Sequence, residues 1–448
     1  MLISINNFLG ILTPIMLLCA GVFFGFRLGW FHLRHPVRML RTMTQRESAG
    51  GVSPIRALTL ALAGTLGVGN IVGVASSIAL GGYGSVLWMW VSAFVAMILK
   101  YAEIVLAMLY RKRDINGELH GGAYYYIKAF FHSKGLKRFG SVLGGVFAIL
   151  CLLNTASMGS IVQANAISSA FEGQFGIPLW VTGGAVAVVS LFIIMGNSER
   201  ISSFTEKIVF IMSVGYVVVS LAALVIHKES VLPAFSKIFE DAFNARSAGF
   251  GVMGFLFASS CRWGCMRGLM SNEAGCGTAP TAHATSNTKS PAKQGLLGIF
   301  EVFVDTILLC SLTALVIIVA GEGVLEFADN PMLITLNAYA TLLGGWAGVY
   351  ITVSVLLFGF ATIVCWAHYG REALLYLCKS KVASKIFVVV YAGLVFFGAV
   401  CSVSFAWELA DLAIGLMTVI NVVILCLMSG EVKRETEKMQ SAECRVQS

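Results

Sequence analysis

The sequence predicts an all-α protein that crosses a membrane about eleven times. Of its 448 residues, 57% are hydrophobic and only 12% are charged, whereas soluble domains carry about 25% charged residues. The hydrophobic residues are gathered in runs long enough to form helices that span a bilayer. The net charge of +8 is typical of membrane proteins with basic cytoplasmic loops, so it predicts a lipid bilayer and no nucleic acid as partner.

Eleven hydrophobic runs follow one another along the chain. The first follows no basic segment, so it predicts a membrane helix (an extra N-terminal helix over 5–30) and no cleaved signal peptide. The run at 334–368 is too long for one span, and Asn330-Pro331 before it predicts a separate surface or re-entrant helix. Ser53-Pro54 and Ser290-Pro291 each place a capping residue before a proline, as at helix starts. The runs are 5–26, 57–82, 84–110, 140–171, 178–196, 205–227, 249–284, 294–320, 334–368, 384–405 and 409–429.

Lysine and arginine are distributed unevenly between alternate loops. One set of loops, together with the tail at 430–448, holds most of them, while the other set holds only Lys228, Lys237 and Arg246. Because cytoplasmic loops collect Lys and Arg, this pattern predicts that the N-terminus lies outside the cell. The C-terminus is expected in the cytoplasm, and the whole chain in the cell (inner) membrane.

The run from Leu58 to Gly84 has a middle that disfavours helix. Four glycines, Gly64, Gly67, Gly69 and Gly73, surround Thr65 and Asn70, and each glycine costs about 1 kcal/mol relative to alanine inside a helix. Freed backbone groups are tolerated at membrane depth only where protein or a water-filled cavity satisfies them. The run therefore predicts a broken helix, the kind of element at which secondary transporters bind substrates and ions.

A second segment, 249–284, is equally rich in glycine and polar residues. Each of the two segments opens a set of five runs, and the two begin on opposite sides of the membrane. This arrangement predicts two inverted repeats, over 57–227 and 249–429, within one transport domain that spans 1–448. It favours a transporter that works by alternating access.

Seven of the charged residues inside the predicted spans are candidates for a structural or functional role. Because such charges are costly, they are usually paired or functional. They can form structural ion pairs, a gating network or direct substrate contacts, and the sequence leaves these three interpretations open. The residues are Lys100, Glu103, Arg262, Arg267, Glu273, Glu301 and Asp305.

Three uncharged polar residues in the spans are candidate ligands. Asn70 and Gln163 can contact substrate or join helices, and Thr362 can bind a cation or its own helix carbonyl. No acidic residue falls within the first break, which favours sodium over a proton relay there. Cys261, Cys265, Cys276 and His283 match no zinc spacing, so no cofactor is expected apart from sodium as coupling ion.

The motifs along the chain resemble those of the alanine or glycine:cation symporter family, the sodium:alanine symporters of prokaryotes. The similarity extends from about Pro54 to Leu375. It rests on GTLGVGNIVGVA (64–75), WMWVSAFVAMILKYAE (88–103), GGAYYYI (121–127), IVQANAI (161–167), RGLMSNEAGCGTAPTAHA (267–284), EVFVDT (301–306) and FATIVCWAHYG (360–370).

The resemblance implies the leucine-transporter fold, with two inverted five-helix repeats and one extra N-terminal helix. It also implies that a small neutral amino acid, alanine or glycine, enters with sodium and that the protein is not an enzyme. A second break near Gly254–Ser260 is expected to line the side-chain end of the pocket. By similarity, sodium contacts the carbonyls of Ala63 and Leu66 and the Thr362 hydroxyl. Substrate contacts are implied for Thr65, Gly67, Gly69, Asn70, Gln163, Gly254, Phe257, Ser259, Thr362 and Trp366.

The sequence departs from the family pattern at several of these motifs. Val68 replaces a threonine in the first break, and GGAYYYI replaces GGPMYYI. Ala361 precedes Thr362 where the family has two adjacent hydroxyl residues, and 260–264 reads SCRWG in place of AIRYG. The missing hydroxyl leaves a proton-coupled or sodium-independent carrier as the alternative. A carrier-like sensor and a membrane enzyme that uses Glu273, His283 and the nearby cysteines are two further alternatives.

Overall fold

The computed structural model describes residues 2–34, 52–115, 117–196, 198–243 and 250–447. Side chains are described throughout these ranges except at 2, 32, 34, 198–207, 250–258, 381 and 442–447. In this part of the chain nearly all residues are helical, and the one short sheet is an antiparallel pair between β1 (Lys112–Arg113) and β2 (Leu119–His120). The predicted all-α class is confirmed.

The helices follow the predicted runs closely. The first half contains α1 (Leu2–Arg27), α2 (Phe31–Arg34), α4 (Pro54–Thr65), η1 (Val68–Asn70), α5 (Val72–Gly81), α6 (Ser85–Tyr110), α7 (Ala123–Ser133), α8 (Lys137–Ala156), η2 (Ser157–Ile161), α9 (Val162–Phe175), α10 (Leu179–Ile194) and α11 (Ser198–Ile226). The second half contains α12 (Lys228–Ala242), α13 (Phe250–Asn272), α14 (Pro280–His283), α15 (Pro291–Val302), η3 (Phe303–Cys310), α16 (Ser311–Ala320), η4 (Glu322–Phe327), α17 (Pro331–Leu343), α18 (Gly345–Leu377), α19 (Lys381–Val400), α20 (Val403–Leu427) and α21 (Ser429–Gln447).

Eight helices in the described ranges are long and apolar enough to cross a bilayer, judged by length and composition. Three shorter apolar helices, α5, α10 and α17, accompany them. The long ones are Ile3–Arg27, Ser85–Tyr110, Lys137–Phe175, Ile208–Ile226, Pro291–Ala320, Gly345–Leu377, Val382–Val400 and Val403–Leu427. The chain is therefore a multi-pass membrane protein.

The predicted division of the run at 334–368 is confirmed. α17 ends at Leu343 and α18 begins at Gly345, and between them Gly344 has a φ of +86° that favours glycine. The two predicted caps are also present. The Ser53 hydroxyl accepts a hydrogen bond from the Arg56 amide, and the Ser290 hydroxyl accepts one from the Lys293 amide.

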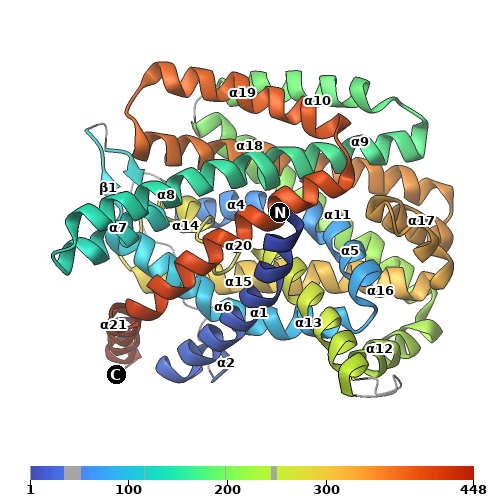
Figure 1. Ribbon diagram of the computed structural model, residues 1–448, viewed down its shortest axis with the longest axis horizontal. Helices are drawn as coiled ribbons and strands as arrows, with labels where there is room; N and C mark the ends of the chain where they lie inside the picture. The colour runs from blue at the N-terminus through green and yellow to red at the C-terminus, as the bar shows by residue number, and fades with distance from the viewer. Residues whose placement is uncertain (1, 35–51, 116, 197, 244–249, 448) are drawn as a thin grey trace.

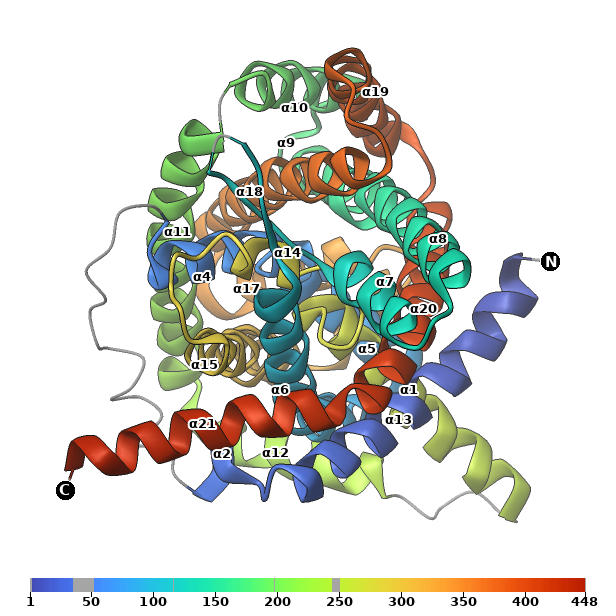
Figure 2. The ribbon, with the colours of Figure 1, turned by 90° about the vertical axis from the view of Figure 1, so that its left-hand side faces the viewer.

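The broken helices lie at the centre of the bundle. In Figure 2, α4 and α14 lie inside a ring of helices that includes α11, α18 and α8. α6 is mostly buried and packs against α13 and α15. The extra N-terminal helix α1 packs against α20 and α6, outside this centre (Figure 1). The fold therefore encloses residues 63–78 of the first glycine-rich segment and 264–284 of the second in protein, as membrane depth requires.

Candidate functional site

The predicted break in the first glycine-rich run is present. α4 ends at Thr65, the backbone is extended at Gly67 (φ −116°, ψ −157°), and η1 forms a single 3₁₀ turn before α5 begins at Val72. All residues from Ala63 to Ile78 are buried. The backbone groups freed by the break must therefore find partners inside the protein.

Gln163 provides one of those partners. Its side-chain oxygen accepts the Val68 amide at 3.1 Å, and its side-chain nitrogen donates to the Met158 carbonyl at 3.0 Å. Met158 belongs to η2, a π-helical turn between α8 and α9. A π-turn replaces the ordinary i→i−4 hydrogen bonds with i→i−5 bonds and is frequent at functional sites. The structure thus brings Gln163 to the first break, next to Gly67 and Val68.

Thr362 approaches the same break from α18. Its hydroxyl oxygen lies 3.1 Å from the Ala63 carbonyl oxygen, 3.5 Å from that of Leu66 and 3.0 Å from that of Phe358 in its own helix. A Cβ added at Gly67 would lie 2.7 Å from this hydroxyl and 2.9 Å from the Gln163 side-chain oxygen. Glycine is therefore required at position 67 by close approach. The three oxygens expected to bind sodium converge within hydrogen-bonding distance.

Asn70 links the first break to two other elements. Its side-chain nitrogen donates to the Ser271 hydroxyl at 3.0 Å and to the Asp305 carboxylate at 2.6 Å. Its side-chain oxygen is buried and has no hydrogen-bond partner in the described part of the chain. The expectation that no acidic residue lies at the first break holds for the sequence around the break but is wrong for the folded protein. Asp305, in η3 and 235 positions further along the chain, contacts the break through Asn70.

The other expected contact residues differ in their proximity to the break. The Thr65 hydroxyl donates to Ala61 in its own helix at 3.2 Å, and the Trp366 indole donates to the Gly64 carbonyl at 3.2 Å. A Cβ at Gly69 would lie 3.5 Å from the Ser271 Cα. Ser259 donates to Leu80 at 3.3 Å, near the far end of α5. Gly254 and Phe257 lie outside the residues whose side chains are described.

The second break is present but not at the expected position. α13 is helical throughout 254–260 and ends at Asn272. The chain then leaves the helix over 273–279, where Glu273, Gly275 and Gly277 have φ values of +54°, +87° and +81°. Sequence could not separate these glycines from those earlier in α13, which permit close packing: a Cβ at Gly268 would lie 2.9 Å from the Ser92 hydroxyl on α6.

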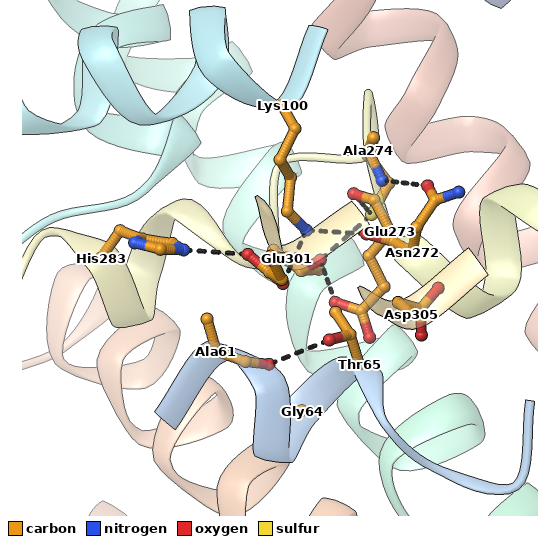
Figure 3. A network of polar contacts seen from close by, with 12 residues as sticks. Ala61, Gly64, Thr65, Lys100, Asn272, Glu273, Ala274, His283, Glu301 and Asp305 are labelled. Atoms are coloured by element: carbon orange, nitrogen blue, oxygen red, sulfur yellow. Dashed lines mark hydrogen bonds and ion pairs between the residues drawn. The ribbon is translucent and has the colours of Figure 1, made fainter. Parts of the chain in front are cut away.

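Lys100 on α6 is the buried cation beside the second break (Figure 3). Its amine lies 3.1 Å from the Glu301 carboxylate and donates to the Asn272 carbonyl at 2.7 Å. His283 lies on the other side of Glu301, at 2.9 Å. Lys100 therefore pairs with Glu301 on α15. The carboxylate of Glu103, one turn further along α6, accepts instead from Asn421 on α20.

Two arginines of α13 face other elements. Arg267 pairs with Asp411 of α20 at 2.9 Å, and its guanidinium lies over the ring of Trp407 at 4.5 Å. Arg262 donates to Asn7 of α1 at 2.9 Å. Sequence analysis overlooked Asp411. A lone acidic residue in the run at 409–429 was the available signal, because a charge inside a span requires a partner.

Two interrupted helices at the centre of an all-helical bundle, each with its freed backbone satisfied by buried polar groups, define a class of membrane transporters. The arrangement is the leucine-transporter fold. A solved structure of this class, MhsT in complex with L-phenylalanine, matches with a TM-score of 0.59 over 87% of this chain and 93% of that one, at 13% identity.

The chain belongs to the sodium:alanine symporter family, whose sequence profile matches residues 1–447. It is 35% identical to the sodium/alanine symporter AgcS of Methanococcus maripaludis over 97% of this chain and 95% of that protein. It is 33% identical to the probable sodium/glutamine symporter GlnT of Bacillus subtilis, over 93% of this chain and 85% of that protein. The family and these relatives indicate sodium-coupled amino-acid transport.

Proposed function

We propose that the protein imports a small neutral amino acid, alanine or glycine, together with sodium. The observation that carries this proposal is the convergence of the Ala63 and Leu66 carbonyls with the Thr362 hydroxyl. Carbonyl and hydroxyl oxygens are the hard ligands that a small cation prefers.

The substrate site of this proposal lies beside the ion site, at η1 and the start of α5. The N-terminus of a helix attracts anions because its amide groups are unpaired and its dipole is positive there. The substrate carboxylate would meet the backbone near Gly67, Gly69 and Asn70, with the Gln163 amide adjacent. Val68 replaces the threonine of the family pattern within η1.

Alternating access supplies the mechanism. We place the N-terminus outside the cell, the C-terminus in the cytoplasm, and the two inverted repeats over 57–227 and 249–429. The pair Lys100–Glu301 connects α6 of the first repeat to α15 of the second, whereas the pair Arg267–Asp411 connects α13 to α20 within the second repeat. One sodium ion entering at −100 mV supplies about 2.3 kcal/mol, which corresponds to about 50-fold accumulation of substrate.

The test is uptake of labelled alanine and glycine into proteoliposomes, with sodium or with choline in its place. Wild type should require sodium. Thr362→Val, which removes the hydroxyl and keeps the shape, should raise the half-saturating sodium concentration at least about tenfold, because a lost ligand to a charged group costs about 1.5–3 kcal/mol. Thr362→Ser, which keeps the hydroxyl, is the matched control and should stay close to wild type.

Undiminished uptake in choline at a fixed pH gradient would contradict sodium coupling. It would favour the proton-coupled carrier, for which Ala361 and the presence of Asp305 at the break are the supporting observations. A panel of neutral amino acids competing with labelled alanine in the same assay identifies the substrate. Preference for a large amino acid, such as glutamine, would contradict alanine or glycine as the substrate.

A further inference from the structure

Three carboxylates surround a single amine beside the second break. Glu103, Glu273 and Glu301 are each no more than 1% exposed, and Lys100 is fully buried among them. Glu301 is the direct partner of Lys100, at 3.1 Å, and the amine also donates to the Asn272 carbonyl. If every carboxylate were ionised, the four groups together would carry a net charge of −2.

His283 contacts Glu301 from the side away from Lys100. Its Nε2 faces Glu301 at 2.9 Å, and its Nδ1 lies 2.8 Å from the side-chain nitrogen of Gln294.

Glu103 is surrounded by hydrogen-bond donors. Its carboxylate accepts from the side-chain nitrogen of Asn421 and from the backbone N–H groups of Gly275 and Gly277 in the break. Several donors directed at one carboxylate stabilise its ionised form. The positive charge of Lys100 on the preceding turn of α6 acts in the same direction.

Glu273 is the least compensated of the three. One of its oxygens accepts from the Thr278 hydroxyl at 2.6 Å, and the other, Oε1, is buried with no partner in the described part of the chain. An unpaired ionised carboxylate in a low-dielectric interior is so costly that such a group usually takes up a proton. We propose that Glu273 is a proton-binding site and that its proton is exchanged with water during each transport cycle.

The surroundings of Glu273 offer no other cation in the described side chains. Charged groups face it from α6 (Lys100 and Glu103) and from α15 and η3 (Glu301 and Asp305). Its uncharged titratable neighbours are Cys276 in the break, Cys151 on α8, and Cys365 and Tyr369 on α18. Lys100 is thus shared among several acids, and a proton on Glu273 reduces the excess negative charge by one.

The position of Glu273 explains why its proton would exchange. It is the first residue after α13, and its φ of +54° is uncommon for a residue with a side chain. The break that it begins is one of the segments that alternating access would move, so the inference rests on the proposed function. The step itself is simple: the carboxylate gains a proton from water on one side of the membrane and returns it to water on the other.

The first experiment is infrared difference spectroscopy on purified full-length protein, which does not depend on transport. The C=O stretching band of a protonated carboxyl should be present at neutral pH in wild type and smaller in Glu273→Gln. Glutamine has the same shape as glutamate and can accept from Thr278. Glu435→Gln, on the tail helix α21 and beside Lys438 at 2.6 Å, is the matched control and should leave the band unchanged. An equal band in wild type and Glu273→Gln would overturn the proposal.

The second experiment follows proton movement in proteoliposomes that contain a pH-sensitive dye. Addition of alanine with sodium should acidify the lumen in wild type and in Glu435→Gln but not in Glu273→Gln. An inward pH gradient of one unit should raise accumulation about tenfold in wild type and leave Glu273→Gln unchanged. Sodium-driven uptake without acidification in wild type would overturn the proton site and leave the proposed function intact. Absence of any amino-acid uptake would instead refute the proposed function.

Discussion

The two breaks both leave backbone groups without helical partners, and different chemical groups satisfy them at each break. At the first break, neutral groups meet freed backbone: an amide from Gln163, a hydroxyl from Thr362 and an extended glycine at 67. At the second, Glu273 and two glycines turn the chain through positive φ, while Lys100 and Glu103 hold the turn with charges of opposite sign. Lys100 faces the C-terminal carbonyl of α13, and Glu103 faces the amides that follow. The cation therefore lies at the negative, C-terminal end of α13, and the anion lies beside the backbone N–H groups that follow it.

This difference suggests a division of labour. Neutral oxygens and close backbone approach suit a site that a cation and a carboxylate enter and leave. Opposite charges fixed to one helix, α6, suit a hinge whose turn must stay folded while the segment moves. Substitutions at the first break should therefore act mainly on binding and transport, and substitutions of the glycines that turn the chain at the second break mainly on stability.

The largest effect is expected for Asn70→Ala. This change removes the amide that donates to Ser271 and Asp305 and leaves a buried carboxylate less well satisfied, which costs about 3 kcal/mol. Alanine binding should fall about a hundredfold or more, measured by titration calorimetry on the purified protein. Asn337→Ala is the control, because the Asn337 amide bonds only within α17. Wild-type affinity in Asn70→Ala would refute the site.

Gly67→Ala should have the next largest effect. The new methyl group would lie 2.7 Å from the Thr362 hydroxyl and 2.9 Å from the Gln163 amide, and neither partner can retreat without losing its contact with the break. Sodium-driven uptake should fall about tenfold or more, since small misplacements of binding groups are costly. Gly73→Ala in the same run meets no atom closer than 3.8 Å and should transport normally. Equal uptake by the two variants would contradict the conclusion that close approach requires glycine at position 67.

Gly277→Ala tests the hinge. A left-handed φ of +81° costs about 1–2 kcal/mol for a residue with a Cβ. The added methyl group would also lie 2.8 Å from the Ala123 Cβ. The apparent melting temperature in detergent should decrease, with substrate affinity per folded molecule retained. Gly323→Ala, with no atom within 4 Å of the new Cβ, should melt like wild type. If Gly277→Ala melted normally but failed to bind, the division of labour would be wrong.

The smallest effect is expected at His120. This residue lies in β2, just before Gly121, and Gly121 packs against Ala284 in the segment that follows the second break. The hydrogen bond from His120 to Glu372 at 2.8 Å raises the pKa of this histidine; burial opposes the rise and the nearby acids support it. The stabilisation is complete below about pH 6.5, the usual histidine pKa, and is lost as pH rises through the raised value. His120→Gln should therefore lose less thermal stability than wild type between about pH 6 and 8. Parallel melting curves for the two proteins across this range would contradict the assignment.

Local sequence was sufficient for the helices and for the first break. Long hydrophobic runs directly indicate helices that are buried in lipid. Four closely spaced glycines indicate a backbone that departs from the α-helix. The second break was misplaced because glycine has two uses in membrane helices: Gly268 permits close packing, whereas Gly275 and Gly277 permit positive φ. Only tertiary structure separates these uses.

The sequence also could not predict which residues pair with the buried charges. Lys100 and Glu103 are neighbours on one helix, yet the first pairs with Glu301 and the second with Asn421. Asp305 meets Asn70, and Asp411 meets Arg267, across large separations in the chain. Spacing along one helix determines which residues share a face. It does not determine which other helix that face meets.

The π-helical turn η2 has a consequence for how this site can change. Such a turn holds one residue more than the α-helix around it, so deletion of one residue within 157–161 would let α8 and α9 join as a continuous α-helix. The Gln163 side chain donates to the carbonyl of Met158 inside this turn, so the deletion would alter the contact that holds its amide beside Val68. A change of one residue in the length of the chain before Gln163 would therefore disturb the first break even with every residue that touches the break preserved.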